Sequence, residues 1–222
     1  QRRLWSTEEG RFADYLDEDD QHRLHRGAHG NVFAYLAEIA TPEQSKSLLD
    51  FIENRCGENR EIALQGNEFG GQMELYFCNY TLQVLGKAGR AGTAEPLIRD
   101  MWDLHFEHDA KGCWEALCRG PVWGVGSVCH SWSVAPLIYA HRYILGVQWD
   151  FASEPGVVHV RPLPGSLEHA RGSVSLPGDA CLHVAWKRQP NGELEIETEL
   201  HGADYQIVIQ NPKPTQSVSV KE

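Results

Sequence analysis

The spacing of apolar residues changes once along this chain, near residue 150, and this change limits the folds open to it. Up to Gly146, apolar residues recur every three or four positions, as they do on one face of an α-helix. After the turn at 154–156 they alternate with polar residues or form short β-branched runs, as in half-buried strands. A chain of 222 residues can form one large domain or two smaller ones. We therefore predict a mainly helical domain over residues 1–150 and a small antiparallel β-sandwich over residues 151–222.

Local signals support helices in the first part of the chain. Thr41 is a predicted N-cap, with Pro42 in the first turn and Gln44 completing a capping box. Gly89 is a predicted C-terminal cap before a tight turn, and the last helix is expected to close at Gly146. The apolar spacing predicts helices over residues 31–40, 41–52, 69–84, 94–105 and 134–145. The first thirty residues fit either a small hairpin or an irregular lead-in to a helix.

Amphipathic helices joined by short loops are typical of a helical bundle, a solenoid or an α/α barrel. No fixed-length repeat is visible, which weighs against the solenoid. In the second part of the chain, the stretch "PNGE" at Pro190–Glu193 predicts a β-hairpin.

The charge of the chain argues against two classes of partner. The net charge is −11, and the acidic residues are scattered along the sequence. Nucleic acids and anionic membrane surfaces both attract basic patches, so neither is an expected partner. The chain begins "QRRLW", without an initiator methionine or a signal-peptide pattern, and we expect it to be a piece of a longer polypeptide. The cellular compartment is therefore left open.

The six cysteines show neither the density of a disulfide scaffold nor CxxC spacing, and we expect buried free thiols. Four histidine and cysteine residues in the helical part could serve as zinc ligands, but the spacing of these four residues matches no structural zinc motif. These four residues are His105, His108, Cys113 and Cys118.

The residues that point to chemistry lie between Trp102 and Trp132, where four tryptophans fall within a window of about thirty residues around Glu115. Glu115 follows Trp114 in the stretch "GCWEALCRG", and His130 stands in "VCHSWS". Aromatic rings stack on the apolar faces of sugars, and carboxylates serve as acids and bases in glycoside hydrolysis. The alternative is structural: a solvated loop carboxylate, a tryptophan that anchors the core and a hydrogen-bonded histidine. The cluster on a glycine-rich loop favours a sugar-binding cavity, with Glu68 and Glu74 as rival carboxylates.

The order of several motifs resembles that of the glycoside hydrolase family 78 α-L-rhamnosidases. The resemblance extends over nearly the whole chain and is most specific in its last hundred or so residues. The motifs that carry it are "LWSTEEGRFADYLDEDD", "ATPEQSKSLLDFI", "FGGQMELYFCNYTLQVLGKAGRAGTAEPLIRDMW", "GCWEA", "SVCHSWSVAPLIYAHRYILGV" and "PGVVHVRPLPGSLEHARGSV".

The resemblance implies a fold and a set of roles. The chain would be the second half of an (α/α)6 six-hairpin catalytic barrel followed by a C-terminal β-sandwich. The reaction would be the inverting hydrolysis of terminal α-L-rhamnosides. By resemblance, Glu115 would be the general base that activates water, His130 would contact the sugar, and Trp114 would line the subsite. The family's general acid lies in the first half of the barrel, to which nothing in this chain corresponds, so the missing half is an implied partner.

Two alternatives stay open at this stage. One is another (α/α)6-barrel glycosidase with a different sugar, since the family's loop between the glutamate and the histidine is often longer than here. The other is a non-catalytic carbohydrate-binding relative that keeps the aromatic walls. The two-carboxylate mechanism implies no metal and no organic cofactor.

Overall fold

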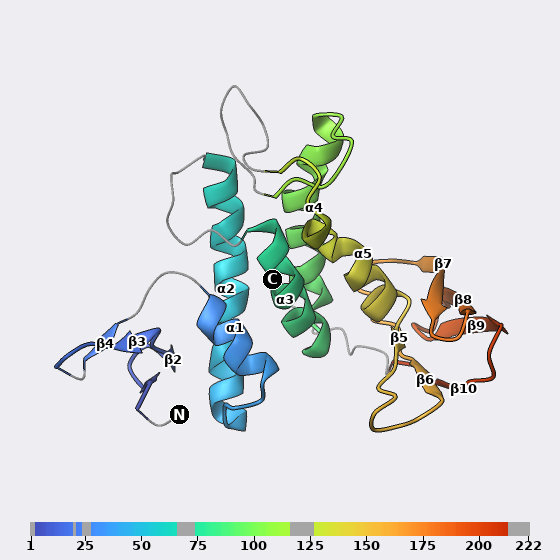
Figure 1. Ribbon diagram of the computed structural model, residues 1–222, viewed down its shortest axis with the longest axis horizontal. Coiled ribbons are helices and arrows are strands. Elements are labelled where there is room, and N and C mark those ends of the chain that lie inside the picture. Colours follow the sequence, from blue (N-terminus) through green and yellow to red (C-terminus); the bar gives the residue numbers. More distant parts are fainter. Residues whose placement is uncertain (1–2, 20, 24–27, 66–73, 116–126, 213–222) are drawn as a thin grey trace. The chain divides into compact units, whose positions relative to one another are not determined.

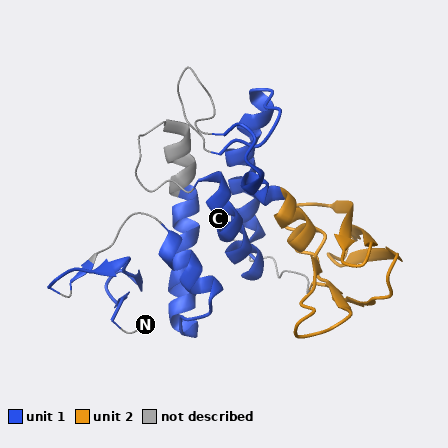
Figure 2. Ribbon diagram, viewed as in Figure 1, with its two compact units in different colours: residues 1–136 blue, residues 137–222 orange. Residues whose placement is uncertain are grey.

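The computed structural model describes residues 3–19, 21–23, 28–65, 74–115 and 127–212 (Figure 1). The chain divides into two compact units, residues 1–136 and residues 137–222, which are described separately (Figure 2). None of the helices in the described part of the chain has both the length and the apolar character needed to cross a bilayer.

The first unit opens with two short antiparallel strand pairs. Strand β1 (Trp5–Ser6) pairs with β2 (Arg11–Phe12), and β3 (Tyr15–Leu16) pairs with β4 (His22–Arg23). The buried side chain of Asn31 holds β2 against the first helix through two hydrogen bonds to Phe12. Its Oδ1 accepts a hydrogen bond from the backbone N–H of Phe12 (2.9 Å), and its Nδ2 donates one to the carbonyl of Phe12 (3.1 Å). The sequence left open a small hairpin or an irregular lead-in to a helix, and these antiparallel pairs show hairpins.

Four α-helices follow in the first unit: α1 (His29–Leu36), α2 (Pro42–Gln65), α3 (Leu75–Lys87) and α4 (Ala91–Glu107). Helices α1 and α4 each contact both α2 and α3. The interior is apolar and includes the fully buried side chains of Val32, Leu48, Ile52, Leu75, Phe77, Leu82, Val84, Leu85 and Met101. Burial of these side chains from several helices is the main source of stability for such a unit. The helix predicted from residue 69 begins at Leu75 among the described residues, and residues 69–73 lie outside them.

Both predicted helix caps are confirmed. The N–H of Gln44 donates to Oγ1 of Thr41 (3.3 Å), and the N–H of Thr41 donates to Oε1 of Gln44 (2.9 Å), which is the reciprocal capping box. At the end of α3, Gly89 has a φ of +71°, and the N–H of Arg90 donates to the carbonyl of Leu85 (2.7 Å). This is the glycine-capped helix end expected before a tight turn.

The last helical segment ends where the sequence predicts. Helix α5 (Ala135–Tyr139) continues into the π-helical segment η2 (Ala140–Ile144), and the chain leaves at Gly146, which has a φ of +79°. The division between the two units falls in this segment, between 136 and 137, earlier than the expected boundary at residue 150. The reason is packing: Leu145 is part of the core of the second unit, and the indole N–H of Trp186 donates to the carbonyl of Ile144 (2.8 Å).

Two three-stranded sheets form the rest of the second unit. One has the order β10 (Gln206–Ile209), β6 (Val157–Val160), β5 (Val147–Gln148). The other has the order β7 (His169–Leu176), β8 (Ala180–Arg188), β9 (Leu194–His201). Both sheets contribute to one buried cluster, made of Leu145, Val147, Val158, Val160, Val174, Leu176, Ala180, Leu182, Val184, Trp186 and Leu194.

One strand pairing differs from the prediction. Strands β10 and β6 are parallel, so the expectation of an antiparallel sandwich is wrong for this pair. Parallel neighbours need a long crossover connection, and the β7–β8–β9 meander in the other sheet supplies it. The predicted hairpin is confirmed: it joins β8 to β9, with a φ of +84° at Gly192 and a hydrogen bond from the N–H of Gln189 to the carbonyl of Glu193 (2.8 Å).

Candidate active site

Glu115 and His130 lie on two chain segments that are hydrogen-bonded to each other. The N–H of Glu115 donates to the carbonyl of Ser127 (2.8 Å), and the N–H of His130 donates to the carbonyl of Cys113 (2.7 Å). Residues 116–126, which connect the segments, lie outside the described residues. The structure thus brings together the two residues that the sequence singled out fifteen positions apart.

The carboxylate of Glu115 is held by the opposite segment. Its Oε2 accepts a hydrogen bond from the backbone N–H of Ser127 (2.9 Å), and the residue is partly exposed. A carboxylate fixed by a backbone donor keeps a defined direction, while its second oxygen can face a ligand or a water molecule. This restraint is non-local in sequence, and no pattern around Ser127 indicates it.

Trp114 anchors the same loop in the helical unit. Its side chain is only 5% exposed, and its ring stacks on that of His105, with ring centroids 4.5 Å apart and an interplanar angle of 28°. Its backbone N–H also donates to Nε2 of His105 (3.0 Å). The position of Glu115 is therefore tied to α4 through its neighbour. That Trp114 also contacts the sugar stays a prediction.

The hydrogen bond that the His105 ring accepts indicates that the ring is neutral. Nε2 accepts a hydrogen bond, so the ring proton must be on Nδ1, which is buried. Burial lowers the pKa of His105 below the usual histidine value, and the backbone carbonyl of Trp102 acts in the opposite direction. Protonation of Nε2 would remove the acceptor for the N–H of Trp114.

This arrangement predicts that acid loosens the Glu115 loop. Because the folded-state pKa of His105 is lowered, its contribution to stability is complete above the unfolded pKa of about 6.5 and is lost as the pH falls through the folded-state pKa. We expect a smaller free energy of unfolding at pH 5 than at pH 7.5. His105→Gln should weaken this pH dependence, because its amide oxygen accepts a hydrogen bond without titrating. The measurement is urea denaturation at both pH values, with His108→Gln as the matched control. An unchanged pH dependence in His105→Gln would contradict the assignment.

His130 stands among aromatic rings at the start of a short 3₁₀ turn, η1 (Ser131–Ser133). Its ring lies 6.5 Å from that of Tyr76 and 6.3 Å from that of Trp132, both in edge geometry. Trp132 is 71% exposed, whereas the indole of Trp102 is buried and donates to the carbonyl of Ser133 (2.9 Å). Trp102 therefore holds the turn in place, and Trp132 offers a free aromatic face beside His130. Nothing in the sequence indicates that Tyr76 approaches this histidine.

A second set of polar side chains, which includes His29 and Glu74, lies near the start of α3. His29 is half-buried, and its ring lies 3.8 Å from that of Phe77. Burial lowers the pKa of His29, and the charges of Glu74 and Asp14 act in the opposite direction. Glu74, one of the rival carboxylates, is the exposed N-cap residue of α3. Sequence reasoning missed this group, because three separate segments contribute to it.

The other candidates from the sequence that the structure describes are His105, His108 and Cys113 of the zinc alternative. Both histidines of the zinc alternative, His105 and His108, lie beside the ring of Trp114. Glu68, Cys118 and Trp123 lie outside the described residues. Within the described residues, no three acidic, histidine or cysteine side chains are arranged so that they could hold a metal ion.

The described part of the chain thus combines packed helices, a carboxylate loop beside the exposed ring of Trp132 and a unit of two sheets. No family model matches the chain, and no curated protein matches it. Among solved structures, it is similar to a GH78 family rhamnosidase of Bacillus sp. GL1, with a TM-score of 0.74 and 24% sequence identity.

The match covers 93% of this chain and 21% of the rhamnosidase chain, so this chain spans about a fifth of that protein's length. The resemblance inferred from the sequence is confirmed at the level of the fold. The chain folds like a part of a GH78 rhamnosidase.

Proposed function

We propose that this chain is part of an inverting glycoside hydrolase that releases terminal α-L-rhamnose from glycosides. The observation that carries the proposal is the fold match over 93% of the chain, together with a glutamate fixed in a loop beside His130 and Trp132. In this proposal, residues 1–150 supply half of an (α/α)6 barrel and residues 151–222 supply a supporting β-sandwich.

Glu115 has the role of general base in the proposed mechanism. The hydrogen bond from Ser127 fixes one carboxylate oxygen, which leaves the other to accept a proton from the attacking water. The loop cannot swing away easily, because Trp114 is buried and its backbone is bonded to His105. A base held in this way keeps the water aligned for attack on the anomeric carbon.

The sugar would lie against the aromatic side of the same loop. His130 can donate a hydrogen bond to a sugar hydroxyl, and the exposed face of Trp132 can stack on the apolar face of the ring. Trp114 is proposed to line this subsite and to hold the base in place. These contacts bind the sugar in the ground state as well as in the transition state.

The general acid would come from outside this chain. In an inverting glycosidase, the acid and base carboxyl groups stand about 6.5–9.5 Å apart, which leaves room for the water. The first half of the barrel is proposed to place an acidic residue opposite Glu115 at this separation. The reaction needs only these two carboxyl groups, the substrate and a water molecule.

The test is hydrolysis by the complete polypeptide that carries this chain. We expect release of an aryl group from an aryl α-L-rhamnoside, and β-L-rhamnose as the first sugar product in a proton NMR time course. The matched substrates are aryl α-L-fucosides, α-D-glucosides and α-D-glucuronides. Faster cleavage of one of these would assign a different sugar. Binding of rhamnosides without any release of sugar would identify a non-catalytic carbohydrate-binding protein instead.

A further inference from the structure

A pocket of about 500 Å³ lies in the second unit, between the edges of its two sheets. Strand β5 stands last in the order of one sheet and β7 stands first in the order of the other, so both are edge strands among the described residues. The π-helical segment η2 contacts both strands. Residues of these three elements line the pocket, together with Ile138 of α5, and its volume is typical of small-molecule sites.

The walls of the pocket are fixed by packing and by a hydrogen bond. A Cβ atom on Gly172 would lie 2.8 Å from Cδ1 of Leu145, so glycine at this position lets β7 approach the end of η2. Nε2 of Gln148 donates to the carbonyl of Arg142 (3.0 Å), which ties β5 to η2. The π-helical geometry of η2 is itself rare and is found frequently at functional sites.

One wall of the pocket is aromatic. The side chain of Trp149 is 39% exposed, and its ring stacks on that of Phe151, with ring centroids 6.2 Å apart and an interplanar angle of 29°. Phe151 stacks in turn on Tyr205, with ring centroids 5.2 Å apart and an interplanar angle of 5°. This stack supports the indole and leaves part of its surface open to the pocket. An exposed indole can stack on the apolar face of a sugar ring.

The polar groups of the pocket can bind several hydroxyl groups of one ligand. Because Nε2 of Gln148 donates within the protein, its Oε1 is the atom that can accept from a ligand. Ser173 and Ser175 each contribute a hydroxyl group from β7. Oγ of Ser173 is hydrogen-bonded to Nδ1 of His183 (2.6 Å), which fixes its direction. The half-buried His141 adds an imidazole from η2.

The charge of the pocket favours an anion. Among the described residues that line it, Arg142 is the only one with a permanent charge, and none is a carboxylate. This composition contrasts with the chain as a whole, whose net charge is −11. The guanidinium of an exposed arginine can bind a carboxylate through two parallel hydrogen bonds.

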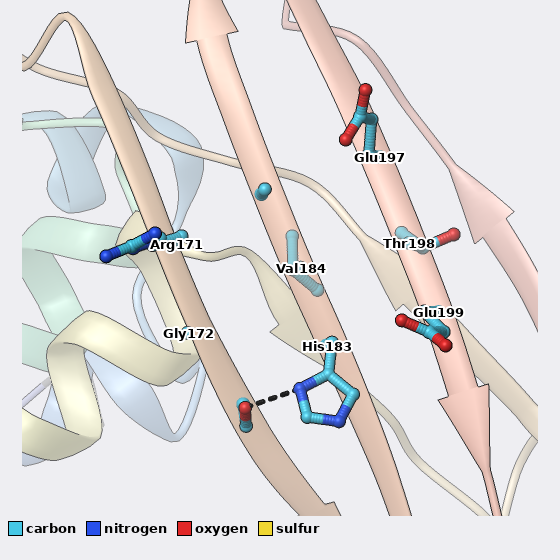
Figure 3. A pocket seen from close by; sticks show the side chains of 9 residues that line it. Arg171, Gly172, His183, Val184, Glu197, Thr198 and Glu199 are labelled. Atoms are coloured by element: carbon cyan, nitrogen blue, oxygen red, sulfur yellow. Dashed lines mark hydrogen bonds between the residues drawn. The ribbon is translucent and has the colours of Figure 1, made fainter.

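A neighbouring depression has a different character. It has a volume of about 570 Å³, is lined by residues of β7, β8 and β9, and shares Ser173 with the pocket. Figure 3 shows Glu197 and Glu199 on β9, across the sheet from Arg171 on β7. Two carboxylates would repel an anionic ligand there. Arg171 therefore serves as a matched control for Arg142.

We propose that the pocket around Arg142 and Trp149 binds a sugar unit that carries a carboxylate, namely a uronic acid residue of a glycan. The carboxylate pairs with Arg142, and the apolar face of the sugar ring stacks on Trp149. The hydroxyl groups of the sugar bind to Gln148, Ser173 and Ser175. No covalent step takes place, so this is a binding site. It uses no residue of the Glu115 loop and does not depend on the proposed hydrolase function.

A sugar acid fits these groups better than an aromatic carboxylate does. An aromatic carboxylate would satisfy Arg142 and Trp149, but it would leave the amide oxygen of Gln148 and the two serine hydroxyls without ligand partners. Polar groups that lose water without a new partner weaken binding. A neutral sugar would use these groups and leave Arg142 unused.

The test is titration of the full chain, followed by NMR, with the methyl glycosides of D-galacturonate and D-glucuronate. We expect at least one of them to bind with a Kd of about 1 mM, as a ligand of this size allows. The signals that shift should include the indole N–H of Trp149 and the backbone amides of Gln148, Ser173 and Ser175. Methyl galactoside and methyl glucoside, which lack only the carboxylate, should bind at least about tenfold more weakly.

Matched variants decide whether the ligand occupies this pocket. Arg142→Gln should weaken binding of the uronide by at least about tenfold, because it removes the charge-assisted hydrogen bonds. Trp149→Ala should weaken it by about three- to tenfold. Arg171→Gln should leave the affinity unchanged. Circular dichroism of each variant checks that the second unit is folded.

Several results would overturn the proposal. These are the absence of binding of either uronide by the unsubstituted chain, equal affinity for the neutral glycosides, and an unchanged affinity in Arg142→Gln. Benzoate that binds as tightly as the uronides would assign the pocket to aromatic carboxylates instead of sugars. Shifts confined to the amides near Glu115 and His130 would place the uronide in the candidate active site. None of these readouts depends on hydrolysis, so they leave the proposed enzyme function to its own test.

Discussion

Replacing Glu115 with glutamine is expected to lower the turnover of an aryl α-L-rhamnoside by the complete polypeptide by about 10²–10⁴-fold. Glutamine keeps the size of the side chain, and its amide oxygen can still accept the hydrogen bond from the N–H of Ser127. It cannot take a proton from water. The loss should therefore fall on kcat, while the thermal unfolding temperature stays close to that of the original protein. The measurement is steady-state kinetics together with thermal denaturation.

Two further variants sharpen this prediction. Glu107→Gln changes an exposed carboxylate at the end of α4 and is the matched control, with no expected loss of turnover. His130→Ala should raise KM more than it lowers kcat, because the proposed contact binds the sugar before and during the reaction. Near-normal turnover by Glu115→Gln would place the base elsewhere, and Glu68 would be the next carboxylate to test.

Replacing Gly146 with alanine is expected to destabilise the second unit by about 3–5 kcal/mol. Gly146 has a φ of +79°, and a Cβ atom there would lie 2.2 Å from the carbonyl carbon of Arg161 and 2.3 Å from the nitrogen of Pro162. These neighbours are backbone atoms. They cannot move aside without breaking the hydrogen bond from the N–H of Arg161 to the carbonyl of Gly146 (2.9 Å), which continues the β5–β6 pairing.

Gly156→Ala is the matched control for this clash. Gly156 has a similar φ of +75°, but no atom lies within 4 Å of the position that a Cβ would take. Alanine there adds only the left-handed backbone strain, about 1–2 kcal/mol. Urea denaturation followed by circular dichroism gives both values, and amide exchange at Val158 and Val160 reports on the second unit. Equal losses in the two variants would show that the backbone contact at Gly146 contributes nothing.

Several features of the fold could be predicted because their signals are local. The capping box of Thr41 and Gln44 spans four residues, and the turn at Gly89 depends on a single residue that accepts a positive φ. The hairpin at Pro190–Glu193 likewise needs only the residues of its own turn. The change in apolar spacing marks helices and strands because each has its own period.

The candidate site could be predicted in part. The residue types around Glu115 and His130 indicated carbohydrate chemistry, and the structure places both on one pair of hydrogen-bonded segments. The supporting contacts could not be predicted. His105 lies nine residues before Trp114, and Tyr76 lies on a different helix from His130, so no local spacing links either pair.

The sequence by itself determined where helices and strands form, where they end and which side chains face the core, because these choices depend on residues a few positions apart. Only the tertiary structure decided which elements meet. The parallel pairing of β6 with β10 joins residues 49 positions apart, as in Val157 and Gln206, and follows from how two sheets share one core. The restraint on Glu115 by Ser127 and the close approach of Gly146 to Arg161 have the same origin. Each of these contacts needs two segments that are distant in the sequence to meet. The burial of apolar faces between the elements supplies the free energy that brings them together.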